Sequence, residues 1–188
     1  MPGKIISVGP RDKIPDGFTL VDVTSRSAEP MYKALSPFYL PAGRLYGDYS
    51  AKNVENAWQY AKVYANYDDN SKPKPEYFDW AQNGWNKTYA DRFPMGKGTR
   101  PVYSWWDGEA LDYISARKKI YVPLYERTAI KTAGYENLRQ RLINSENIAV
   151  SCFDSYNYED DFEKTLNDPR RILGHAMVLA NMLTADLS

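Results

Sequence analysis

The chain has 188 residues, of which 43% are hydrophobic and 26% are charged. Lysine and arginine together number 24, and so do aspartate and glutamate, so no net positive charge draws the protein to nucleic acid or acidic membranes. A single cysteine leaves no intramolecular disulfide framework, and no apolar run approaches the length of a membrane span. These features predict a cytoplasmic protein without a membrane anchor.

The predicted elements begin with two short strands, separated by a turn that contains proline, glycine and aspartate. A connection rich in aromatic residues leads to a helix, and four further helical segments follow. One more strand precedes a closing helix, which Asp168 caps and Pro169 begins. The expected ranges, in chain order, are 4–8, 18–24, 50–67, 76–91 (interrupted at Gly84), 109–122, 123–132, 135–142, 147–153 and 168–183.

This order of elements predicts an α+β fold that is mostly helical, with a small β component near the N-terminus and around residues 147–153. We expect a single compact domain of residues 1–188, because no repeat, low-complexity tract or linker divides the chain. Its core is expected at about residues 30–184, preceded by a strand segment at residues 1–30.

The helix expected over residues 50–67 has two faces with different properties. Asn53 is placed to cap it, which puts Glu55 in the first turn, where the helix dipole favours a charged carboxylate. An apolar stripe suited to packing runs beside a polar row. The stripe consists of Val54, Ala57, Trp58, Ala61 and Ala65, and the row consists of Glu55, Gln59, Lys62 and Asn66. Glu55 either takes part in chemistry or only stabilises the start of the helix.

Two further features carry candidate groups. Asp154 directly follows a predicted strand, a common position for a catalytic carboxylate, although acidic loops are also often simply solvated. Trp105 and Trp106 are adjacent and cannot both face one core. One of them either offers a stacking surface for a planar base or anchors the packing at the start of a helix capped by Asp107. Both interpretations of each feature stay open.

His175 is the only histidine, and its apolar neighbours along the closing helix favour a core residue with a hydrogen-bonded ring. Gly174 lies inside that predicted helix, where it costs about 1 kcal/mol relative to alanine, so a helix or a ligand is expected to approach it closely. Cys152 has no evident partner base, and one histidine with one cysteine gives no metal-ligand spacing. We therefore expect no cysteine nucleophile, no metal and no cofactor.

The segment Ser36–Tyr39, followed by Val54–Tyr64, resembles the NADAR (YbiA-like) superfamily, in which an S-N-F segment precedes a helix that reads roughly S-E-H-x-x-Q-x-x-K-F. Three later features occur in the same order as in that superfamily, namely Ala116-Arg117, Asn137–Leu142 and Leu173-Gly174. The correspondence centres on Glu55, Gln59 and Lys62, while Asn56 stands where the superfamily usually has histidine and Arg171 lies near a usual asparagine.

Members of that superfamily are N-glycosidases that cleave a bond between ribose and nitrogen, in riboflavin-pathway intermediates or in ADP-ribose attached to guanine. The resemblance implies a hydrolase of this type, whose partner is a nucleotide-like small molecule or an ADP-ribosylated nucleic acid. It implies catalytic roles for Glu55 and Asp154 and substrate-binding roles for Gln59, Lys62, Trp58, Trp106, Arg117, Gly174 and His175. The alternatives are a nucleotide-binding module without turnover and a protein-interaction module.

Overall fold

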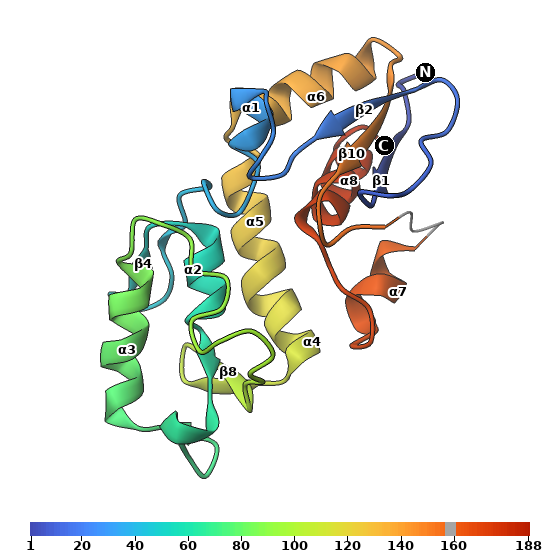
Figure 1. The fold of residues 1–188 in the computed structure, drawn as a ribbon. Coiled ribbons are helices and arrows are strands. Elements are labelled where there is room, and N and C mark those ends of the chain that lie inside the picture. Colours follow the sequence, from blue (N-terminus) through green and yellow to red (C-terminus); the bar gives the residue numbers. More distant parts are fainter. Residues whose placement is uncertain (157–160) are drawn as a thin grey trace. The chain divides into compact units, whose positions relative to one another are not determined.

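The computed structural model describes residues 1–156 and 161–188. The described residues fall into two compact units. We call residues 1–37 with 125–188 the terminal unit and residues 38–124 the central unit. Strands and helices occur in both units, so the α+β class is confirmed (Figure 1). The single domain stays a prediction. No described helix combines the length and apolar character needed to cross a membrane.

The terminal unit is built on a parallel sheet of β1 (Ile5–Val8), β10 (Asn147–Ser151) and β2 (Phe18–Asp22), in the order β1-β10-β2. The three predicted strands are therefore confirmed, and β10 enters between the two N-terminal strands (Figure 1). In the register, Val150 lies opposite Val21, and both side chains are buried. This pairing joins segments that are far apart in the sequence.

Helices complete the terminal unit. They are α1 (Pro30–Lys33), α6 (Ala133–Ile143), α7 (Phe162–Asn167) and α8 (His175–Asp186), while α5 (Val122–Ala129) begins in one unit and ends in the other. Helix α8 contacts β1, and α1 contacts α6. Apolar side chains from α6, β10 and α8 are fully buried and form the core, among them Leu138, Leu142, Ile148, Met177 and Leu179.

The closing helix begins later than predicted. Asp168 does not cap it; its carboxylate accepts a hydrogen bond from the backbone N–H of Arg170, in a turn that follows α7. Helix α8 starts at His175, with Gly174 as the N-cap residue. A proline after aspartate therefore begins a turn here, and His175 belongs to a helix start rather than a helix interior.

The central unit contains short strands around helices α2 (Val54–Gln59) and α3 (Pro75–Trp85). Its main sheet has the antiparallel order β5-β8-β9, and two hairpins, β3-β4 and β6-β7, accompany it. The remaining elements are β3 (Gly43–Arg44), β4 (Ser50–Ala51), β5 (Lys62–Val63), η1 (Ala65–Tyr67), β6 (Asp68–Asp69), β7 (Lys72–Pro73), β8 (Tyr103–Trp106), β9 (Glu109–Leu111), α4 (Tyr113–Ala116) and the π-helical segment η2 (Arg117–Tyr121).

Helix α2 is much shorter than the helix predicted over residues 50–67. Asn53 caps it as expected, because its side chain accepts a hydrogen bond from Asn56 N–H. The helix ends at Gln59, since the carbonyl of Tyr60 accepts a hydrogen bond from the Tyr77 hydroxyl. The next residues pair with β8 instead, and Lys62 lies opposite Ser104. Tertiary hydrogen bonds thus override the helical pattern.

Further local predictions are wrong, among them the start of the helix expected over residues 109–122, because Glu109–Leu111 form β9 and α4 begins at Tyr113. Gly84 does not interrupt α3, which continues to Trp85; a Cβ at Gly84 would lie 2.0 Å from the Tyr60 ring, so glycine allows close packing of α3 against the segment after α2. Asp107 does not cap a helix but turns the β8–β9 hairpin together with Gly108, both at positive φ.

Candidate functional site

A hydrogen-bonded row of three side chains follows α2. The Gln59 amide nitrogen Nε2 donates to Oε1 of Glu55 at 2.9 Å. Lys62 Nζ donates to Oε1 of the same Gln59 amide, also at 2.9 Å. Glu55 and Gln59 are each only 7% exposed. We call Glu55, Gln59 and Lys62 the polar row; the amide in its middle holds the carboxylate at one end and the ammonium at the other.

The row was predicted from a helical spacing that the chain does not keep. Lys62 belongs to β5, and its long side chain reaches back to Gln59 at the end of α2. The sequence therefore brings these three groups together through the turn at Tyr60 rather than through a third helical turn. Asn66, the fourth predicted member, is exposed in η1.

Burial gives Lys62 an unusual protonation equilibrium. It lowers the pKa of the ammonium from 10.5 to about 8, because a charged group loses favourable hydration. The Glu55 carboxylate opposes this change, while the nearby Arg92 cation adds to it. Lys62 therefore changes its charge within the range in which enzymes commonly work.

Aromatic side chains border the polar row on one side. The Lys62 ammonium lies 5.2 Å from the centre of the Trp58 ring. Trp58 in turn packs against Tyr121 at 5.3 Å and Tyr113 at 6.4 Å between ring centres. The Arg117 guanidinium lies 4.2 Å above the Tyr113 ring and donates from Nη2 to the Tyr113 hydroxyl at 2.9 Å. A second cation thus shares this aromatic surface.

Arg117 is 1% exposed, whereas the adjacent Lys118 and Lys119 are exposed. Burial therefore distinguishes Arg117 from the two lysines that follow it in the sequence. Arg117 is the first residue of η2, and such π-helical turns are frequent at functional sites. Tyr113, its partner one turn earlier, was not among the residues predicted from the sequence, although the four-residue spacing places both on one helical face.

Asn56 is a structural residue. It is 0% exposed, and its Nδ2 donates to the carbonyl oxygens of Lys87 and Tyr89 at 3.2 and 2.9 Å. Its Oδ1 accepts from the backbone N–H of Asp91 at 2.8 Å. The side chain therefore fastens α2 to residues 87–91 and is occupied by backbone groups.

Trp106 belongs to a different group of rings. It packs edge-on against Tyr46 at 4.9 Å between ring centres, and Tyr46 continues to Tyr49 and Trp85. Within the part of the chain that the structure describes, the buried Nε1 of Trp85 has no hydrogen-bond partner. The structure thus shows packing contacts for Trp106, whereas its role in substrate binding stays a prediction.

Asp154, Gly174 and His175 come together in the terminal unit. A Cβ at Gly174 would lie 2.5 Å from the Asp154 carbonyl oxygen and 2.7 Å from Sγ of Cys152. The close approach expected at Gly174 is confirmed. The segment that approaches Gly174 is the loop after β10, rather than a helix or a ligand. Because Glu55 and Asp154 belong to separate units, their cooperation as a carboxylate pair stays a prediction.

Cys152 has a histidine partner that was not predicted from the sequence. Burial alone raises the pKa of this thiol, but the charge of His175, a hydrogen bond with its ring and the Ala176 N–H together lower the pKa. His175 Nε2 also lies 2.8 Å from the Val23 carbonyl oxygen, which fixes the ring. No sequence signal links the end of a strand to the start of α8. Since Cys152 is 1% exposed, the pair is closed to solvent.

Within residues 1–156 and 161–188, no group of three or more histidine, cysteine, aspartate or glutamate side chains is arranged to hold a metal ion. Residues 10–179 match DUF6939, a family of unknown function. The chain belongs to that family. No curated protein matches it. The DUF6939 match includes the polar row, Arg117, Asp154 and the Cys152–His175 pair, so every candidate group described above lies inside the family region.

Proposed function

We propose that the chain is an N-glycosidase that cleaves a ribose–nitrogen bond in a nucleotide-like or ADP-ribosylated substrate. The observation that carries this proposal is the buried Glu55 carboxylate, held in one orientation by Gln59 Nε2 at 2.9 Å. The order of Glu55, Gln59 and Lys62 also matches the motif of the NADAR superfamily, so we propose a distant relationship with that superfamily.

The proposed reaction needs a fixed negative charge near the anomeric carbon. As the bond from C1′ to nitrogen breaks, its electron pair goes to the nitrogen, and positive charge develops on C1′ and the ring oxygen. An ionised Glu55 stabilises that charge and accepts a proton from the water that attacks C1′. The departing nitrogen takes up a proton. The products are therefore a sugar with a hydroxyl group on C1′ and a protonated base.

The other members of the site suit binding of the rest of a nucleotide. Lys62, which is partly exposed, supplies positive charge for a phosphate group, and the buried Arg117 adds to the positive potential of the site. The Trp58 and Tyr113 rings that these cations contact suit stacking with a planar base. Under this proposal, Trp106 of the same unit contributes to substrate binding, while the roles expected for Asp154, Gly174 and His175 of the terminal unit stay predictions. The Asn56 amide is engaged with the carbonyl groups of Lys87 and Tyr89, so under this proposal it takes no part in the reaction.

The proposal is tested by incubating the purified chain with a panel of nucleotides and with an oligonucleotide that carries ADP-ribose on guanine. Mass spectrometry then detects free base or released ADP-ribose. We expect product from the wild type and from Glu76→Gln, which changes an exposed carboxylate of the central unit, but not from Glu55→Gln. Tight binding of ADP-ribose without product would instead support a binding module. Equal activity of Glu55→Gln and the wild type would exclude the proposed role of Glu55.

A further inference from the structure

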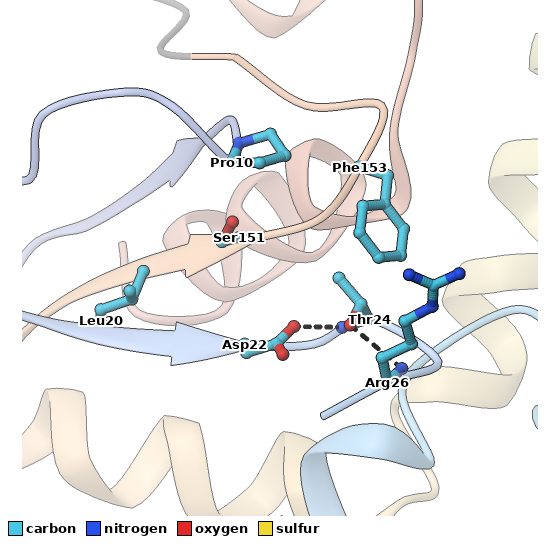
Figure 2. Close-up of a pocket in the computed structure, with 7 residues that line it drawn as sticks. All are labelled: Pro10, Leu20, Asp22, Thr24, Arg26, Ser151 and Phe153. Carbon is cyan, nitrogen blue, oxygen red and sulfur yellow. Dashed lines mark hydrogen bonds between the residues drawn. The ribbon is translucent and has the colours of Figure 1, made fainter. Parts of the chain in front are cut away.

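The terminal unit holds a pocket of about 330 Å³ at the carboxyl ends of strands β2 and β10 (Figure 2). Asp22 ends β2 and Ser151 ends β10, and the two residues are direct register partners. In parallel sheets, ligands bind outside the carboxyl ends of the strands, because the loops there are free to diverge and carry polar groups. The pocket therefore lies at the edge of this sheet where a ligand is expected.

The Asp22 carboxylate is oriented by the local backbone. One of its oxygens, Oδ1, accepts a hydrogen bond from Thr24 N–H at 2.8 Å, and Thr24 Oγ1 accepts from Arg26 N–H at 3.1 Å (Figure 2). No described residue donates to the second oxygen of Asp22 or forms an ion pair with it. The wall made by β2 thus presents a fixed hydrogen-bond acceptor to the pocket, with the Ser151 hydroxyl on the neighbouring strand.

Arg26 supplies a positive charge to the same pocket that Asp22 lines. Its guanidinium lies over the exposed Phe153 ring, 5.5 Å from the ring centre (Figure 2). A cation–π contact of this kind restricts the guanidinium and leaves it N–H groups for two-point binding of a phosphate or carboxylate. No acidic side chain among residues 1–156 and 161–188 forms an ion pair with Arg26.

We propose that this pocket binds a small hydroxylated organic anion, whose phosphate or carboxylate group meets Arg26 and whose hydroxyl groups meet Asp22 and Ser151. Leu20, which is exposed on the same wall, contacts the carbon skeleton. A volume of about 330 Å³ lies at the lower end of the range for ligand pockets, which favours a molecule of sugar-phosphate size over a dinucleotide. The proposal does not depend on the function assigned to the polar row.

Binding to the intact chain is measured by calorimetry and by amide shifts in NMR spectra, with four probes. Ribose 5-phosphate and ribonate carry an anionic group with hydroxyl groups, whereas ribose lacks the anion and inorganic phosphate lacks the carbon skeleton. We expect one or both of the first two to bind, at least roughly tenfold more tightly than the last two. Their relative affinity shows whether phosphate or carboxylate is preferred. The shifts should centre on Asp22, Thr24 and Ser151.

Three variants complete the test. Arg26→Gln and Asp22→Asn should each weaken binding by roughly tenfold, since each removes a charged hydrogen-bonding group. Arg170→Gln, which changes an exposed arginine of the same unit, should bind as the wild type does. The proposal is overturned if neither hydroxylated anion binds, if inorganic phosphate binds equally tightly, if the shifts centre elsewhere, or if Arg26→Gln retains full affinity.

Discussion

Lys62 Nζ lies 2.9 Å from Oε1 of Gln59, and this contact decides which way the Gln59 amide faces. An ammonium group can only donate, so the amide oxygen must face Lys62 and the amide nitrogen must face Glu55. The orientation of the carboxylate therefore depends on a residue in another element of secondary structure. Under the proposed function, Lys62 positions Glu55 as well as supplying charge.

Lys62 should make stability and activity depend on pH near 8. The folded-state pKa is lowered from 10.5 to about 8, so between these values the unfolded chain binds more protons than the folded chain. The free energy of unfolding should therefore rise with pH across this window, by at most about 3 kcal/mol from this group. Urea denaturation at several pH values measures the rise. Lys62→Met should remove it, whereas Lys118→Met, at an exposed position, should leave it intact.

Asn56→Ala should destabilise the fold by about 2–3 kcal/mol, because it leaves buried polar groups of the segment 87–91 without a partner. Asn56→His should also destabilise, since imidazole cannot donate twice and accept once in the same plane. Denaturant unfolding measures both. Asn66→Ala, at an exposed asparagine of the same unit, is the control. A stability unchanged by Asn56→Ala would contradict the bridging role.

Gly84→Ala should destabilise by roughly 1–3 kcal/mol, although alanine favours a helix interior by about 1 kcal/mol. The added methyl group would lie 2.0 Å from the Tyr60 ring, so the packing between Tyr60 and α3 must open. Tyr60→Ala removes the ring. In a chain that already carries Tyr60→Ala, the substitution Gly84→Ala should therefore destabilise less than it does in the wild type. Simple additivity of the two changes would argue against the contact.

The sequence predicted the elements whose cause is local. The three strands of the parallel sheet have strong apolar patterns, and Asn53 caps α2 through its own side chain. The end of α2 could not be predicted, because the Tyr77 hydroxyl that binds the Tyr60 carbonyl comes from another helix. The start of α8 depends likewise on the fit of Gly174 against the loop at Asp154.

The candidate site, too, could be predicted only where its cause is local. The residue types of the polar row were identified from their spacing, although their geometry comes from the turn into β5. The burial of Arg117 and its contact with Tyr113 depend on the π-helical turn, which has no clear sequence signal. The Cys152–His175 pair joins a strand end to a helix start, and only the fold brings them together.

The measurement that tests the role of Glu55 most directly compares turnover and thermal stability in the Glu55→Gln variant. The replacement keeps the size of the side chain and its ability to accept from Gln59, but removes the charge. We predict that product formation, followed by mass spectrometry on the substrate that the wild type turns over, falls by at least about 100-fold while Tm stays nearly unchanged. Retained turnover, or lost turnover together with a large fall in Tm, would contradict the account and make Glu55 a structural residue.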